Sequence, residues 1–271
     1  MSGKVYLVGA GPGDPELLTL KALRLLRSAE VVLHDDLITS EILKLISPVA
    51  QVQNVGKRCG SKTIRQEEIN FLMVALASSG RQVVRLKSGD PLIFGRAGEE
   101  IEALRQGNVE YEIVPGVTSA LGAAASAGIP LTHRHASSTL VLTTGSHASD
   151  SRDKEWAQYA AGKATLVVYM PGQNYVETSV KLKAAGFAEE TPCAVISRAT
   201  TPQQRTLHTT VADLRNASKL TSPTLLIVGD VVRFADQNSI REIASFAAPQ
   251  GTFASTMFAS AKNTGRDEEL A

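Results

Sequence analysis

The sequence predicts an α/β protein of two domains, and three observations support that prediction. Short β-branched segments alternate with longer amphipathic segments, the order expected for largely parallel sheets with right-handed crossovers. A glycine-rich loop at 9–13 directly follows the first of these short segments. Near the middle of the chain, Pro115-Gly116 and a small-residue helix, Ala120–Ala127, interrupt the alternation. We therefore expect an N-terminal domain over 1–115 and a C-terminal domain over 116–247.

Eight segments are short, apolar and rich in β-branched residues, which is typical of buried strands. In chain order they are Val5–Val8, Val31–His34, Gln82–Lys87, Tyr111–Val114, Thr139–Thr143, Thr165–Tyr169, Cys193–Ser197 and Thr224–Val228. Six longer segments have the apolar spacing of helices. They are Pro15–Arg27, Thr39–Leu45, Arg65–Ser78, Ala97–Arg105, Ser119–Ala127 and Gln173–Ala185. Asp14-Pro15 marks the first helix start, because the carboxylate caps free N–H groups and proline fits the first helical position.

Length, charge and hydropathy limit the classes of function. The chain has 271 residues and a formal net charge of +1, so it lacks the overall positive field expected for a nucleic-acid-binding protein. No apolar run reaches the roughly 18 residues that a membrane span needs, and the first strand is too short for a secretory signal. We therefore expect a cytoplasmic protein. Residues 248–271 lose all periodicity and are rich in small residues, which predicts a flexible tail.

Neither a disulfide framework nor a metal site is expected. The two cysteines, Cys59 and Cys193, lie far apart and outside any CxxC or Cys/His cluster. His133 and His135 could share one face of a strand, but no third ligand stands near them in the sequence.

The glycine-rich segment Val8–Pro15 allows two interpretations from its residues alone. Dinucleotide-binding folds also begin with a strand, a glycine loop and a helix, with an acidic residue about 20 positions later, where Asp35 stands. The G-x-G-x-x-G fingerprint fails, however, because its third glycine would be Asp14, whose carboxylate would repel a pyrophosphate. Pro12 also removes a backbone N–H from any anion cradle. The alternative is a tight strand-to-helix turn that binds no ligand.

A series of short motifs extends from Val5 to about Val232, and none of them is specific alone. They are Val8-Gly9-Ala10-Gly11-Pro12-Gly13-Asp14-Pro15, Leu17-Leu18-Thr19, Asp35 with Leu37, Gly56-Lys57-Arg58, Arg85-Leu86-Lys87-Ser88-Gly89-Asp90-Pro91, Phe94-Gly95-Arg96, Glu99-Glu100, Pro115-Gly116-Val117-Thr118-Ser119, Gly128-Ile129-Pro130-Leu131-Thr132-His133-Arg134 and Val168-Tyr169-Met170. In joint order and spacing the series resembles the uroporphyrinogen-III C-methyltransferases, within the tetrapyrrole (corrin/porphyrin) methyltransferase superfamily.

The resemblance implies the class III methyltransferase fold, two α/β domains with S-adenosylmethionine in a cleft between them, and a homodimer. By position it implies cofactor contacts from Pro12, Ser88, Gly89, Asp90, Ile93, Thr118, Ser119, Met170 and Ala199. Asp90 is a candidate acceptor for the ribose hydroxyls, Gly89 permits close backbone approach, and Met170 suits an apolar wall. A plain type I or II turn is the alternative interpretation of Gly89-Asp90-Pro91.

The activity implied by the resemblance is methylation of uroporphyrinogen III at C2 and C7, giving precorrin-2 and two S-adenosylhomocysteine. This is the first step toward sirohaem, cobalamin or haem d1. A substrate with eight carboxylates requires fixed cations, for which Lys57, Arg58, Arg96 and Arg134 are candidates, with solvated surface charges as the alternative. Methyl transfer needs neither an enzyme nucleophile nor a metal, so the rate gain should come from holding the reactants in line.

After the methyl additions a proton must leave a bridging carbon of the macrocycle, and the base that takes this proton is open between two assignments. In one, Arg96 clamps the substrate and Asp35 or a substrate carboxylate takes the proton. In the other, Arg96 acts as the base with help from Glu99, although an arginine of ordinary pKa is a poor base.

Departures from the family pattern leave a second class of function open. The family usually has Tyr at the position of His34, Arg at that of Asp36, Gly at that of Ser88 and Gly at that of Pro171. A binding or regulatory protein that keeps the fold without catalysis is therefore an alternative, and a nicotinamide oxidoreductase is a third. Related branches methylate later corrin precursors or a diphthamide precursor, but 131–134 and 94–96 favour the uroporphyrinogen branch.

Overall fold

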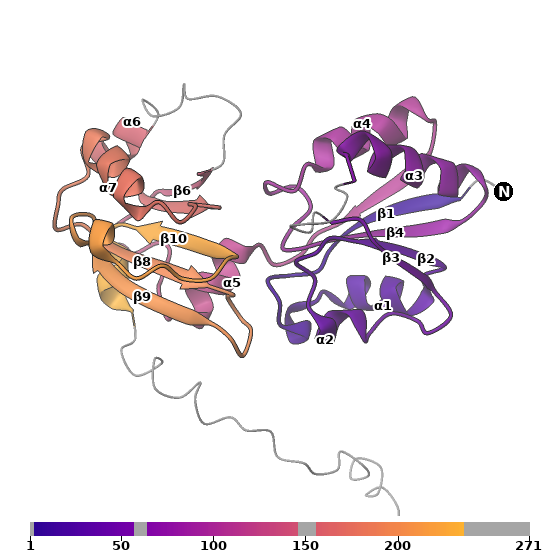
Figure 1. Ribbon diagram of the computed structural model, residues 1–271, viewed down its shortest axis with the longest axis horizontal. Helices are drawn as coiled ribbons and strands as arrows, with labels where there is room; N and C mark the ends of the chain where they lie inside the picture. The colour runs from indigo at the N-terminus through magenta and orange to yellow at the C-terminus, as the bar shows by residue number, and fades with distance from the viewer. Residues whose placement is uncertain (1–2, 57–63, 146–155, 236–271) are drawn as a thin grey trace, which may run out of the picture.

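The protein consists of two α/β domains, each built around a five-stranded sheet, with helix α5 (Ser119–Ser126) between them (Figure 1). The computed structural model describes residues 3–56, 64–145 and 156–235. Within these ranges no helix is both long and apolar enough to cross a bilayer. The predicted tail, 248–271, lies outside the described residues.

The first sheet is entirely parallel, with the strand order β3-β2-β4-β1-β5. Its strands are β1 (Lys4–Gly9), β2 (Val31–His34), β3 (Gln51–Asn54), β4 (Gln82–Lys87) and β5 (Glu110–Val114). The parallel pairing follows from helical connections between successive strands. All five carboxyl ends therefore lie at one edge of the sheet, where ligands bind in open α/β folds.

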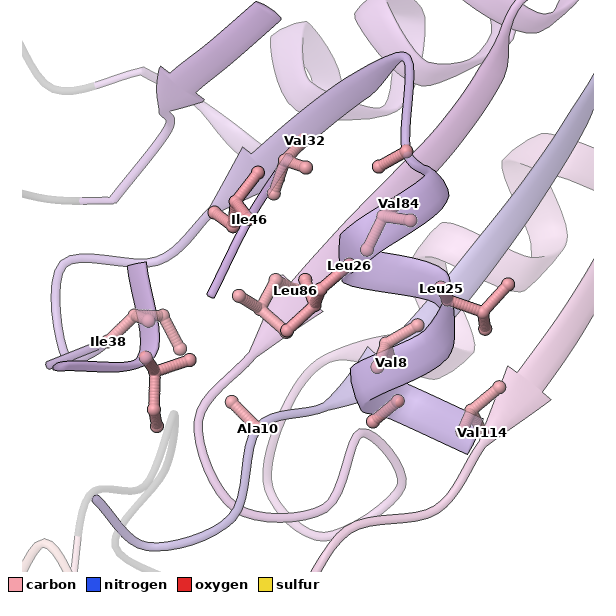
Figure 2. Packing of buried hydrophobic residues seen from close by; sticks show 13 residues of the cluster. Val8, Ala10, Leu25, Leu26, Val32, Ile38, Ile46, Val84, Leu86 and Val114 are labelled. Carbon is pink, nitrogen blue, oxygen red and sulfur yellow. The ribbon is translucent and has the colours of Figure 1, made fainter. Parts of the chain in front are cut away.

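Helices cover both faces of this sheet. They are α1 (Leu20–Ser28), α2 (Ser40–Leu43), α3 (Gln66–Ser78) and α4 (Ala97–Gln106). On one face, Leu25 and Leu26 of α1 pack with Val8, Val84 and Leu86 of the strands (Figure 2). On the other face, α3 and α4 bury a second apolar cluster. A fully buried leucine stabilises such a core by about 2 kcal/mol.

The predicted helix Pro15–Arg27 is wrong as one continuous element. Asp14 accepts a hydrogen bond from the N–H of Glu16 at 2.8 Å and starts only a single 3₁₀ turn, η1 (Pro15–Leu17). Thr19 then accepts from the N–H of Ala22 at 3.1 Å and begins α1. Because threonine is a strong N-cap, its hydroxyl captures the backbone and opens a second helix start.

The second sheet has the order β6-β7-β10-β8-β9 and is mixed. Its strands are β6 (Leu140–Thr144), β7 (Thr165–Tyr169), β8 (Pro192–Ser197), β9 (Arg205–Thr210) and β10 (Thr224–Val228). The expectation of largely parallel sheets is wrong here, because only β6 and β7 pair in parallel. The connection from β8 to β9 contains no crossover helix, so these strands form an antiparallel pair.

The two faces of the second sheet carry separate apolar clusters. One contains small residues of α5, such as Ala120 and Ala123, packed on β7, β8 and β10. The other contains Trp156 of α6 (Trp156–Ala161) and Leu182 of α7 (Tyr175–Ala184). Two short 3₁₀ turns, η3 (Asp213–Asn216) and η4 (Asp230–Phe234), complete the described chain. Helix α5 therefore packs with the second sheet, although it follows the first sheet closely in the chain.

Candidate active site

Three loops converge at the carboxyl edge of the first sheet. The loop after β1 and the loop after β4 exchange two backbone hydrogen bonds between Gly11 and Gly89, at 3.1 and 2.8 Å. The segment after β5 approaches them closely, because a Cβ atom on Gly9 would lie 2.5 Å from the nitrogen of Gly116. A side chain at Gly9 or at Gly116 would therefore push these loops apart.

The glycine-rich loop also contacts the second domain. The ring of Pro12 packs on α5, where a Cβ atom on Gly122 would lie 2.5 Å from its Cγ atom. The N–H of Asp14 donates to the hydroxyl of Thr200 at 3.1 Å. The loop is thus a contact between domains, which differs from the phosphate cradle of a dinucleotide-binding fold.

Gly89 precedes a turn that begins at Asp90, whose carboxylate has unused acceptor capacity. Gly89 has a φ of 67°, in the left-handed region that favours glycine. The Asp90 carboxylate accepts from the N–H of Leu92 at 2.8 Å through Oδ1 and from the N–H of Gly116 at 3.0 Å through Oδ2. A carboxylate has about four acceptor positions, so two remain for hydroxyl groups of a ligand.

A tyrosine that sequence reasoning missed organises the start of α5. The hydroxyl of Tyr169 lies 2.5 Å from that of Thr118 and accepts from the N–H of Ala120 at 3.0 Å. Burial raises the pKa of Tyr169, so the hydroxyl stays protonated. From the first domain, the ring of Phe94 meets the Tyr169 ring at 4.9 Å between centroids. In the sequence, the position of Tyr169 at the end of a predicted strand and beside Met170 was the feature that could have indicated this role.

Most of the candidate cofactor residues contact one another or lie next to each other, and the others are adjacent to them in the chain. A Cβ atom on Gly89 would touch the Ser119 hydroxyl at 3.3 Å, which joins the loop after β4 to α5. Ile93 donates its N–H to the carbonyl of Asp90 at 3.2 Å. Met170 follows Tyr169 and is 51% exposed. The remaining two candidates lie beside this group: half-buried Ser88, which precedes Gly89, and buried Ala199, which precedes Thr200.

Arg96 and Glu99 form an exposed ion pair at the start of α4. The guanidinium donates to both carboxylate oxygens, at 2.8 and 2.6 Å. The hydrogen bond from Arg96 lowers the pKa of Glu99, and the same bond raises the pKa of Arg96. A guanidinium with a raised pKa is an even poorer base than a free one, which favours the assignment of Arg96 as a clamp.

Asp35 belongs to a buried charge network that sequence reasoning did not predict. Arg85 of β4 donates to Asp35 Oδ1 at 2.5 Å and to Glu100 Oε1 at 3.0 Å, and Lys87 donates to the same Glu100 oxygen at 2.9 Å. Burial acts to lower the pKa of Arg85, but the carboxylates of Asp35 and Glu100 outweigh it and raise that pKa. Burial, reinforced by Arg85, lowers the pKa of Lys87.

Of the three other expected cations, Lys57, Arg58 and Arg134, the structure describes Arg134 alone. Lys57 and Arg58 lie outside the described residues. Arg134 is exposed in a turn closed by a bridge between His133 and Ser137. His133 stacks on the ring of Phe234 at 4.1 Å, and the described part of the chain contains no group of three His, Cys, Asp or Glu residues able to hold a metal.

The chain matches a known protein family. The model of the Tetrapyrrole (Corrin/Porphyrin) Methylases matches residues 4–215. The chain belongs to this family. Siroheme synthase 2 of Aeromonas hydrophila is 47% identical over 87% of the chain, and the siroheme synthase of Azotobacter vinelandii is 48% identical over 87%. The matches cover 50% and 51% of those proteins, so the chain spans about half the length of the curated relatives.

Two solved structures extend the likeness to three dimensions. One is a uroporphyrin-III C-methyl transferase from Thermus thermophilus complexed with S-adenyl homocysteine. It is 40% identical with a TM-score of 0.75, and the alignment covers 85% of the chain and 99% of that protein. The other, the cobalt precorrin-4 methyltransferase CbiF, is 32% identical with a TM-score of 0.74, covering 84% and 95%. Both confirm the predicted family fold of two α/β domains.

Proposed function

We propose that the chain transfers methyl groups from S-adenosylmethionine to C2 and C7 of uroporphyrinogen III, forming precorrin-2 and two S-adenosylhomocysteine. The proposal rests on one observation: the structure of this chain aligns with that of the Thermus thermophilus enzyme over 99% of that enzyme's chain. Three motifs of the resembling series, 8–15, 85–91 and 115–119, form the connected loops at the carboxyl edge of the first sheet. The product would enter a pathway to sirohaem, cobalamin or haem d1.

The residues present fit S-adenosylmethionine. A side chain at Gly89 would fill the space beside Ser119, whereas glycine leaves backbone and hydroxyl groups free to meet a ligand. Asp90 has acceptor positions left for ribose hydroxyls, and the half-exposed residue Met170 offers an apolar wall. When bound, the cofactor supplies an activated methyl group on a positively charged sulfur. Its proposed contacts are Pro12, Ser88, Gly89, Asp90, Ile93, Thr118, Ser119, Met170 and Ala199.

The substrate site lies on the first-domain side of these loops in this proposal. Arg96 binds substrate carboxylates, held in place by Glu99, with Lys57, Arg58 and Arg134 as further cations. Asp35 accepts the ring proton, because its side chain is 30% exposed and Arg85 occupies only Oδ1. The raised pKa of Arg96 supports this division of roles.

The remaining proposals concern organisation. We divide the chain into domains over 1–115 and 116–247, since the first sheet ends at Val114 and α5 packs in the second core. The family resemblance supports a homodimer and a cytoplasmic location, with a small-molecule tetrapyrrole as the partner.

The deciding experiment incubates the full chain with S-adenosylmethionine and enzymatically prepared uroporphyrinogen III. Mass spectrometry should find a product carrying two added methyl groups, and calorimetry should find S-adenosylhomocysteine binding. Binding without a methylated product would overturn the proposal in favour of a regulatory protein. Absence of binding, or binding of a nicotinamide cofactor instead, would overturn it as well.

A further inference from the structure

The buried carboxylate of Glu100, on α4, is linked to two residues of the proposed substrate site. It is linked to Asp35 through Arg85, and to the turn of Arg96 through Lys87. The Glu100 side chain is 0% exposed, and those of Arg85 and Lys87 are each 3% exposed. Glu100 Oε1 accepts from Arg85 Nε and Lys87 Nζ, and from Gln66 Nε2 of α3 at 3.3 Å. Oε2 has no hydrogen-bond partner among the described residues. Three donors on one oxygen fix this carboxylate in one orientation.

This arrangement is costly for a purely structural core. Removing ions from water carries a large penalty, and buried ion pairs are often no better than apolar residues of similar size. With Asp35 included, the network balances two carboxylates against two cations. The same face of the sheet carries the ordinary apolar residue Val83, which packs in one cluster with Leu104 of α4. If these charged side chains position residues of the site, that role explains why they occupy a place where apolar residues would pack equally well.

One arm of the network ends at Asp35. Arg85 donates to Glu100 through Nε and to Asp35 through its terminal NH2 nitrogen. A planar guanidinium held at one edge by a fixed carboxylate presents its other edge in a fixed direction. Glu100 therefore orients Asp35 through Arg85, and within the described ranges Arg85 contacts the Oδ1 atom of Asp35 and leaves Oδ2 to other groups.

The other arm supports the turn that carries Arg96. A Cβ atom on Gly95 would lie 3.2 Å from the Cε atom of Lys87, so the lysine stem lies directly beneath this turn. The N–H of Glu100 donates to the carbonyl of Arg96 at 3.4 Å. Arg96 itself has a φ of 57°, an unusual backbone conformation for arginine that the surroundings must maintain.

We propose that Glu100 is a positioning residue for methylation, which sets the Asp35 carboxylate relative to the Arg96 turn through Arg85 and Lys87. The inference rests on the proposed function, since Asp35 and Arg96 have their roles from it. Glu100 does not touch the substrate in this scheme. Its loss should therefore impair turnover far more than cofactor binding, because small misplacements of reacting groups have large effects on rate.

The first test compares Glu100→Gln with Leu104→Ala in the full chain. Leu104 lies one turn later on α4 and is also fully buried, but its side chain is apolar, so it serves as the control for lost stability. Glu100→Gln should lower kcat by about tenfold or more, with S-adenosylhomocysteine affinity within about twofold of wild type. Leu104→Ala should lower the melting temperature but keep kcat within about threefold at temperatures where it is folded.

The second test uses the double variant Glu100→Gln/Lys87→Met. Glu100→Gln alone leaves two buried cations against one carboxylate, and this imbalance could prevent folding. The double variant restores the balance, because only Arg85 and Asp35 remain charged. Its melting temperature should recover toward wild type while kcat stays at least about tenfold low, since the neutral amide oxygen of Gln holds Arg85 less firmly than a carboxylate does.

Two results would overturn the inference. One is a folded Glu100→Gln variant with wild-type kcat. The other is a double variant whose kcat recovers together with its melting temperature, because the charges would then serve stability alone. Failure of the proposed function is distinguishable, since wild-type protein would then form no methylated product.

Discussion

The rings of Phe94 and Tyr169 meet at 4.9 Å between centroids, although they belong to different domains. Phe94 follows β4 of the first sheet, and Tyr169 is the last residue of β7 in the second. The Tyr169 hydroxyl continues the contact to Thr118 and Ala120 at the start of α5. One tyrosine thus ties the loop that carries Asp90 and Arg96 to the helix that carries Ser119.

Tyr169→Phe should lower the free energy of unfolding by about 1–3 kcal/mol, because the buried N–H of Ala120 loses its hydroxyl partner. Tyr111→Phe is the matched control, since its hydroxyl accepts only an exposed bond from Arg105. That change should remain within about 0.5 kcal/mol. Urea unfolding measures both variants, and equal effects would contradict the special role of Tyr169.

Gly89→Ala should weaken S-adenosylhomocysteine binding by at least about tenfold, because a methyl group would occupy the space beside Ser119. It should also cost about 1 kcal/mol of stability, since φ is 67°. Gly186→Ala separates the two effects: it has a φ of 92° but lies far along the chain beside Ala160. Calorimetry should find that Gly186→Ala binds S-adenosylhomocysteine as tightly as wild type. If both variants lose affinity equally, Gly89 is not part of the cofactor site.

Arg96→Ala should raise the KM for uroporphyrinogen or abolish turnover, while the affinity for S-adenosylhomocysteine stays within about twofold. The reason is that Arg96 is proposed to bind substrate carboxylates on an exposed turn. Arg233→Ala removes a similar exposed ion pair, with Asp230 of the second domain, and should leave both constants unchanged. Steady-state kinetics measures the KM and the turnover, and calorimetry measures the affinity for S-adenosylhomocysteine. Unchanged turnover in Arg96→Ala would exclude the residue from the mechanism.

Local sequence patterns were sufficient for the strands that are buried on both faces. Val31–His34 and Thr165–Tyr169 are continuous apolar runs, and the structure has strands with those bounds. Gln51–Asn54 is an edge strand with polar, partly exposed side chains, so its pattern resembles a loop. Arg205–Thr210 is likewise a polar edge strand, and its hairpin partner alone makes it a strand. Edge strands depend on pairing rather than on their own hydrophobicity.

The site could be predicted only in part for a related reason. Motif order pointed to Asp35, Gly89 and Asp90, which lie at the carboxyl edge of the first sheet. The pairing of Arg85 with Glu100 joins a strand to a helix across the core, and no local spacing encodes that contact. Arg85 and Lys87 stand at alternate positions of a buried strand, and buried cations require buried acidic partners. This pattern was the feature of the sequence that could have predicted the network.

Cys193 provides a prediction that depends on pH. It is fully buried in β8, and burial raises the pKa of its thiol from 9.0 to about 12. Between these values the unfolded chain loses the thiol proton while the folded chain retains it. The free energy of unfolding should therefore fall as pH rises above 9, and the effect of this group should end near pH 12. Cys59→Ser is the reference protein, compared with Cys59→Ser/Cys193→Ala by urea unfolding at successive pH values. The gap between the two curves should change in this window because only one protein carries the thiol. Parallel curves would mean that the native thiol ionises as readily as the unfolded one, against the burial that the structure gives it.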